Sequence, residues 1–168
     1  HANNMAIQIY SDSANNSTHN SMEAYASRGS IVTPTVVNPD DIMFSYSHYG
    51  YDGAQYRLSS VISASIDPDA TVSSGAVPGQ LIIATTPDNG STLKFVVLDK
   101  DGNFGINVTN PTKKLEVNGN GEFASEVLLG RMDQTAINAL TAVNGMIVYN
   151  TTTNKFQGYE GGAWSNLI

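Results

Sequence analysis

Residues 102–119 contain the feature that most restricts the fold of this chain, which is a set of very short strand patterns separated by turns. They read GNFGINVTNPTKKLEVNG, so glycine, asparagine and proline interrupt every apolar stretch. Leu115 and Val117 alternate with polar residues, the two-residue period of a strand with one buried face. Strands this short do not make an independent core, and we expect them to need a partner surface.

The rest of the chain shows the same pattern of short apolar runs between turns. Residues 42–49 and 56–66 are rich in β-branched and aromatic residues, and turns of Gly, Asp, Asn and Pro surround them. Further along, residues 122–129 are a possible strand. Residues 133–140 have the apolar spacing and the leading aspartate of a short helix. Three short strands follow, and the last carries the only tryptophan, Trp164.

These patterns predict a mainly β protein in four parts. Residues 1–24 form an N-terminal extended or shaft segment, and residues 25–101 form a β-rich domain. Residues 102–121 form a turn-strand joint, and residues 122–168 form a small C-terminal module of one short helix and a three-stranded meander. Three strands of this length are marginally stable alone. Their open edges indicate oligomerisation, in which copies of the chain complete one another's sheets.

Composition excludes several functional classes. The 168 residues carry a net charge of −7 and are only 14% charged, so a basic surface for nucleic acid is not expected. The chain has no cysteine, which excludes disulfides and thiol nucleophiles. No apolar run approaches the roughly 20 residues that span a bilayer, so membrane insertion is not expected. The chain starts with His1 and Ala2 rather than methionine, which indicates a fragment or the remnant of a tag, and we expect the end of a longer protein.

Residues 102–117 resemble a signature of bacteriophage tail fibre and tailspike proteins, Gly-Asn-Val-Gly-Ile-Gly-Thr-x-x-Pro-x-x-Lys-Leu-x-Val. In this chain Phe104 replaces the valine of the signature, and Asn107 replaces its third glycine. Other stretches are similar to motifs of the same family and occur in the same order, namely residues 28–41, 49–56, 78–86 and 145–164. Each motif is weak alone, and their order makes the resemblance specific.

The resemblance implies an elongated, intertwined homotrimer in the tail of the virion. It implies the C-terminal, receptor-binding part of a fibre that attaches the virion to a bacterial surface glycan, either capsule or lipopolysaccharide. Other tail proteins would be contacted through an N-terminal part that this chain lacks. We expect no enzymatic activity. The alternatives are a fragment of a polysaccharide depolymerase, either a glycoside hydrolase or a lyase, and a bacterial surface adhesin built from similar modules.

The candidate receptor-binding residues form one aromatic group, which consists of Tyr46, His48, Tyr49, Tyr51 and Tyr56. Tyrosine offers a flat apolar ring with a polar tip, which suits both sugar rings and protein interfaces. Strand alternation predicts that Tyr46 and His48 share one face and that Tyr49 lies on the other. The competing interpretation is that alternate members of the group pack in the β core.

No catalytic residue, metal site or cofactor is predicted. Asp99, Asp101 and Asn103 match the first three ligands of a calcium loop, but Phe104 and Asn110 replace its glycine and glutamate. A hairpin turn is therefore the favoured interpretation. The three histidines lack metal-ligand spacing, although a threefold axis could gather one side chain from each chain. No pair of carboxylates can be assigned to glycoside hydrolysis.

Overall fold

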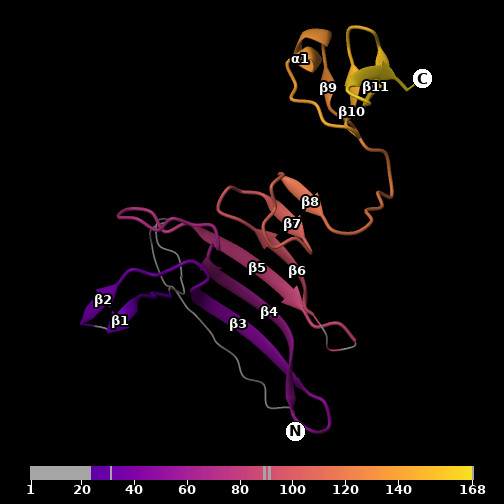
Figure 1. The fold of residues 1–168 in the computed structure, drawn as a ribbon. Helices are drawn as coiled ribbons and strands as arrows, with labels where there is room; N and C mark the ends of the chain where they lie inside the picture. The colour runs from indigo at the N-terminus through magenta and orange to yellow at the C-terminus, as the bar shows by residue number, and fades with distance from the viewer. Residues whose placement is uncertain (1–23, 31, 89, 91, 168) are drawn as a thin grey trace, which may run out of the picture. The chain divides into compact units, whose positions relative to one another are not determined.

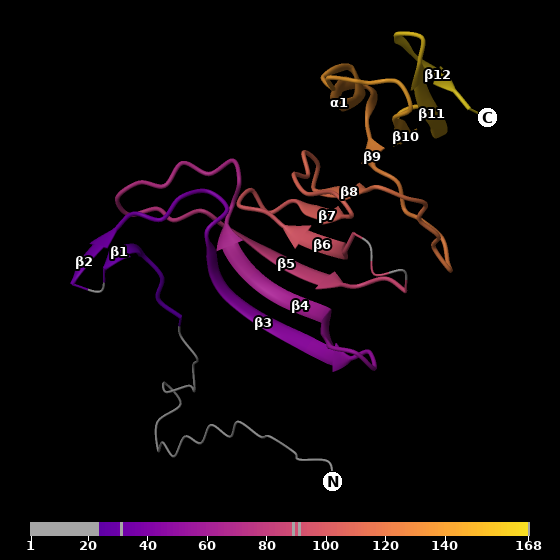
Figure 2. The ribbon, with the colours of Figure 1, turned by 60° about the horizontal axis from the view of Figure 1, so that its bottom comes forward.

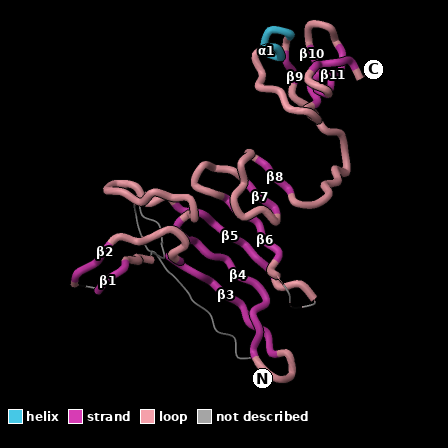
Figure 3. The backbone as a smooth tube through the Cα atoms, in the orientation of Figure 1, coloured by secondary structure: helices cyan, strands magenta, loops and turns pink. Residues whose placement is uncertain are grey.

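The computed structural model describes residues 24–30, 32–88, 90 and 92–167, and it divides the chain into two units, His1–Asn120 and Gly121–Ile168. The described residues are mainly β, as predicted, with one short helix (Figure 3). The segment predicted for residues 1–24 lies outside the described residues except for Ala24. No described helix is long and apolar enough to cross a membrane.

A six-stranded sheet forms the body of the first unit, and its strands follow the order β3-β4-β5-β6-β7-β8 (Figure 1). Neighbouring strands are antiparallel from β3 to β7, whereas β7 and β8 are parallel. The two strands predicted within residues 102–121 are therefore the last two strands of this sheet. The bounds are β3 Ile42–Tyr51, β4 Tyr56–Ile66, β5 Gly79–Thr85, β6 Lys94–Leu98, β7 Phe104–Ile106 and β8 Leu115–Val117.

The turn between β6 and β7 is held by one carboxylate. Asp99 Oδ1 accepts hydrogen bonds from the backbone N–H groups of Asp101 at 2.9 Å and Asn103 at 2.8 Å. Partial burial raises the pKa of Asp99, but the bonds from Asn103 and Asp101 outweigh it and leave the pKa below its ordinary value. Asp99 acts here as a turn acceptor, in agreement with the hairpin-turn interpretation of this segment.

The loop between β7 and β8 lies close against β7 at a glycine. A Cβ atom on Gly105 would lie 2.5 Å from the carbonyl oxygen of Val108 and 3.4 Å from the Cβ of Pro111. Only glycine permits this approach without displacing the loop backbone. Pro111 is itself buried, so the loop is packed onto the sheet rather than projecting from it.

A separate hairpin of β1 (Arg28–Ser30) and β2 (Thr33–Thr35) precedes the sheet (Figure 2). Arg28 donates two hydrogen bonds to Asp41, at 2.8 Å from Nε and 2.7 Å from Nη2. The bonds from Arg28, followed by one from the backbone N–H of Asn38, lower the pKa of Asp41 to about 2. This paired geometry connects the hairpin to the start of β3.

The second unit is a four-stranded sheet with one helix, and its strand order is β12-β11-β10-β9. The predicted helix is confirmed as α1 (Gln134–Asn138), and Asp133 caps it by accepting from the backbone N–H of Ala136 at 2.8 Å. The three predicted strands are confirmed, and a two-residue strand is added beside them. The bounds are β9 Arg131–Met132, β10 Ile147–Asn150, β11 Lys155–Glu160 and β12 Ala163–Asn166.

The possible strand at residues 122–129 is wrong, because the structure has no strand there. The sheet of the second unit ends at β9, which pairs with β10 over only two residues. Residues 122–129 do not pair with β9 and so do not extend this sheet. Most of their side chains are exposed, and Leu128 is 84% exposed.

A buried asparagine forms the polar centre of the second unit. Asn150 is fully buried, and its Nδ2 donates to the side-chain oxygens of Gln134 at 2.8 Å and Gln157 at 3.0 Å. Its Oδ1 accepts from the backbone N–H groups of Thr152 at 2.9 Å and Thr153 at 3.2 Å. The side chain thereby joins β10, β11, the helix and the β10–β11 turn. Sequence analysis missed this residue because asparagine is ordinarily a turn residue.

Candidate functional site

Two complete rows of apolar side chains cross all six strands of the larger sheet of the first unit. Residues that are directly opposite on neighbouring strands share a face, so the strand register identifies each row. We call the surface formed by both rows the apolar face. Its first row is Tyr46, Ile62, Ile83, Val96, Ile106 and Val117, and its second row is Phe44, Ala64, Leu81, Leu98, Phe104 and Leu115.

The apolar face is uncovered in the described protomer. Nine of its large side chains are exposed, from 36% for Phe44 to 59% for Leu115. Neither row contains a charged residue, and the polar row of His48, Ser60, Thr85 and Lys94 forms its border on four strands. Among the described residues of this unit, no helix or second sheet packs over the six strands (Figures 1 and 2).

The opposite face of the same sheet carries smaller side chains than the apolar face and is better covered by the rest of the chain. Ala84 and Val97, which point to this side, are only 3% and 2% exposed. The close approach at Gly105 places residues 108–111 against the same side. A hollow of about 680 Å³ remains there between strands and loop, with Ile82 and Phe95 among its lining residues. The more apolar face is thus the more exposed one, the reverse of a self-contained β domain.

The structure divides the predicted receptor-binding group into two sets, because the register between β3 and β4 shifts between His48 and Tyr49. Tyr46 and His48 lie on the side of the apolar face, with ring centroids 4.6 Å apart in an edge-to-face arrangement. His48 Nδ1 lies 3.1 Å from the hydroxyl of Ser60. Tyr51 and Tyr56 are directly opposite each other beyond this shift, beside the β3–β4 turn, and their ring centroids are 5.5 Å apart. Tyr49 lies two residues before Tyr51 on β3, so these two side chains share a side of the strand.

The hairpin that carries the second tyrosine group is fixed by hydrogen bonds at its turn. Asp52 Oδ1 accepts from the backbone N–H groups of Ala54 and Gln55, both at 2.8 Å, and Arg57 Nε donates to Oδ2 at 2.9 Å. The bond from Gln55 is the largest of the contributions that lower the pKa of Asp52. At this end of the sheet the residues Tyr49, Tyr51 and Tyr56 are 61%, 63% and 73% exposed.

Residues 105–168 match the protein family described as "Phage tail like trimerisation region". This match supports a structural role in a phage tail. We call these residues the trimerisation region. It contains most of β7, all of β8 and the whole second unit. A search of curated proteins finds no match to this chain.

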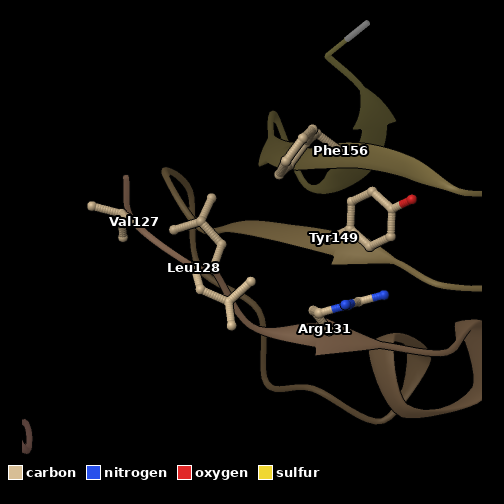
Figure 4. Close-up of a pocket in the computed structure, with 6 residues that line it drawn as sticks. Val127, Leu128, Arg131, Tyr149 and Phe156 are labelled. Atoms are coloured by element: carbon tan, nitrogen blue, oxygen red, sulfur yellow. The ribbon is translucent and has the colours of Figure 1, made fainter. Parts of the chain in front are cut away.

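A small hollow of about 290 Å³ lies within the trimerisation region (Figure 4). The guanidinium carbon of Arg131 is 5.4 Å from the ring centroid of Tyr149, and that ring meets Phe156 edge-on at 5.2 Å. Val127 and Leu128 form another wall of the hollow. Its lining has no carboxylate, thiol or imidazole, so the hollow offers apolar packing and one cation–π contact rather than acid–base chemistry.

Metal binding finds no support in the described part of the chain, where no three His, Asp or Glu side chains are grouped as a metal site. The acidic residues Asp67 and Asp99 both accept backbone hydrogen bonds within their own loops. Within the described residues we therefore take two features as candidates for recognition. One is the apolar face, and the other is the β3–β4 hairpin that carries Tyr49, Tyr51 and Tyr56, which we call the tyrosine hairpin.

Proposed function

We propose that this chain is a structural and adhesion component of a phage tail fibre, which works as a homotrimer and attaches the virion to a bacterial surface glycan. The match of residues 105–168 to a phage tail-like trimerisation region carries this proposal. The mainly β architecture and the uncovered apolar face are consistent with a chain that is completed by other copies of itself.

The tyrosine hairpin is the proposed receptor contact. Tyr49, Tyr51 and Tyr56 are exposed on a hairpin whose turn is hydrogen-bonded through Asp52, so little conformational freedom is lost when a sugar ring stacks on them. Tyr46 and His48 are separate from this group, because Tyr46 belongs to the apolar face and His48 to its polar border. A trimer would present three hairpins, and several fibres would multiply the weak contacts into firm attachment.

The first test of this function is adsorption of the labelled protein to host cells. Tyr51→Ala removes one ring of the Tyr51–Tyr56 pair, and we expect binding to fall by about tenfold or more, because each loss is repeated in every copy. Tyr25→Ala is a matched control, since Tyr25 is 90% exposed but far from β3 in sequence. Equal adsorption of both variants would contradict the assigned contact.

The oligomeric state and the absence of catalysis need separate measurements. Light scattering coupled to gel filtration should give three times the chain mass of 17.9 kDa. Purified capsule or lipopolysaccharide should keep its chain length during prolonged incubation with the protein. A clean monomer would remove the homotrimer from this proposal, and shortened polysaccharide would replace adhesion with depolymerisation.

A further inference from the structure

We propose that the apolar face is the subunit interface of the first unit, and that its occupant is the same face of two further copies of this chain. This inference builds on the homotrimer of the proposed function and extends it. The matched family covers residues 105–168. The apolar face, in contrast, reaches back through the four earlier strands β6, β5, β4 and β3 of the sheet.

Continuity with the trimerisation region identifies the occupant. Ile106, Leu115 and Val117 belong to the trimerisation region and also supply the β7 and β8 ends of the two apolar rows. Each row then continues without interruption through β6, β5 and β4. A surface that starts in residues matched to a trimerisation family and keeps its character across the sheet is best completed by further copies of the same chain.

The composition of the face fits a permanent interface between identical chains. Six strands at about 4.8 Å spacing make rows roughly 25 Å wide, and two neighbouring rows form one contiguous patch. Soluble monomers rarely leave such a patch open, and the cores of homodimer-type interfaces are enriched in aromatic and aliphatic residues and poor in charge. Because neither row carries a charge, three copies of the face can meet around an axis without placing like charges together.

The opposite face is the weaker candidate for this interface. Its central side chains Ala84 and Val97 are already buried by the protomer's own chain. Serines occupy several of its positions on β3 and β4, including Ser45 and Ser63, which are directly opposite each other. Burying those hydroxyls against an apolar partner would cost free energy unless each found a new hydrogen bond.

Thiol labelling tests the proposal directly, because the natural chain has no cysteine. Ile83→Cys places a single thiol at the centre of the apolar face, where the native side chain is 46% exposed in the protomer. Val77→Cys is the matched control, since Val77 is 57% exposed in the loop before β5 and lies outside both rows. Each variant is first checked by light scattering and then labelled with a maleimide reagent with and without urea.

The expected result is a trimer in which Cys at position 83 reacts at least about tenfold more slowly than Cys at position 77, with the two rates converging in urea. Leu81→Cys, in the second row, should show the same protection, and it replaces Ile83→Cys in the experiment if that variant does not fold. A trimer with equal rates at both positions would overturn this inference and leave the proposed homotrimer intact. A monomer that labels freely would overturn both. A monomer in which the thiol at position 83 is protected would also overturn the proposed interface, because another part of the same chain would then cover the apolar face.

Discussion

The buried asparagine of the second unit allows a quantitative test of how the trimerisation region is stabilised. Replacing Asn150 by alanine removes four hydrogen bonds at once, two donated by Nδ2 and two accepted by Oδ1. In the variant, the backbone N–H groups of Thr152 and Thr153 can donate hydrogen bonds to water instead, because both residues are exposed. Gln157 is only 8% exposed, so its side-chain oxygen loses a partner that water does not easily replace.

The expected cost follows from these different environments. The hydrogen bonds to the exposed turn contribute about 0.5–1 kcal/mol each, and an unsatisfied buried oxygen adds about 1–2 kcal/mol. Asn150→Ala should therefore destabilise the second unit by about 2–4 kcal/mol. For so short a unit this is a large part of the total free energy of unfolding, which is on the order of 0.1 kcal/mol per residue.

Tryptophan fluorescence provides the assay, because the only tryptophan of the chain lies in this unit. Trp164 is on β12, and its ring centroid is 5.2 Å from that of Tyr159. A urea titration at fixed protein concentration, followed through Trp164, should show a lower midpoint for Asn150→Ala with little change in slope. Asn144→Ala, at an exposed position of the same unit, is the control. If the two variants shift the midpoint equally, the network does not stabilise the unit and the reasoning is refuted.

Three further predictions concern local features. The pKa of Asp41 is about 2 against an ordinary 3.8, so the stability from its pair with Arg28 is complete above about pH 4 and is lost as the pH falls toward 2. Asp41→Asn should flatten the dependence of melting temperature on pH in that window, and an unchanged profile would contradict the pairing. Asp133→Ala should cost the helix about 1 kcal/mol by the Trp164 assay, whereas Asp133→Ser should restore most of it. Gly105→Ala should lower the free energy of unfolding by about 1–3 kcal/mol and so reduce the thermal midpoint, because the new Cβ meets a backbone oxygen. Gly121→Ala, which meets nothing within 4 Å, should leave it unchanged.

Local patterns in the sequence determined the strands and the helix of this chain with good accuracy. The helix was found because its cap and its apolar spacing are contained within residues 133–140, and β10 to β12 were found because turn residues bound each of them. The same local logic was wrong at residues 122–129. An apolar stretch becomes a strand only when a neighbour accepts its hydrogen bonds, and the sequence does not show whether that neighbour exists.

Composition also determined that the chain would be mainly β, and the motif resemblance agreed with the match to a phage tail-like trimerisation region. Only the tertiary structure decided which face of the sheet would remain open. Alternation shows that Ile62 and Ala64 share a side of β4, but it cannot show that Ile83 and Val96 continue the same row. That depends on register between strands, and a shift of one residue would turn every side chain to the other face. The separation of Tyr49, Tyr51 and Tyr56 from Tyr46 and His48 also depends on register, which shifts between His48 and Tyr49 and pairs Tyr51 with Tyr56.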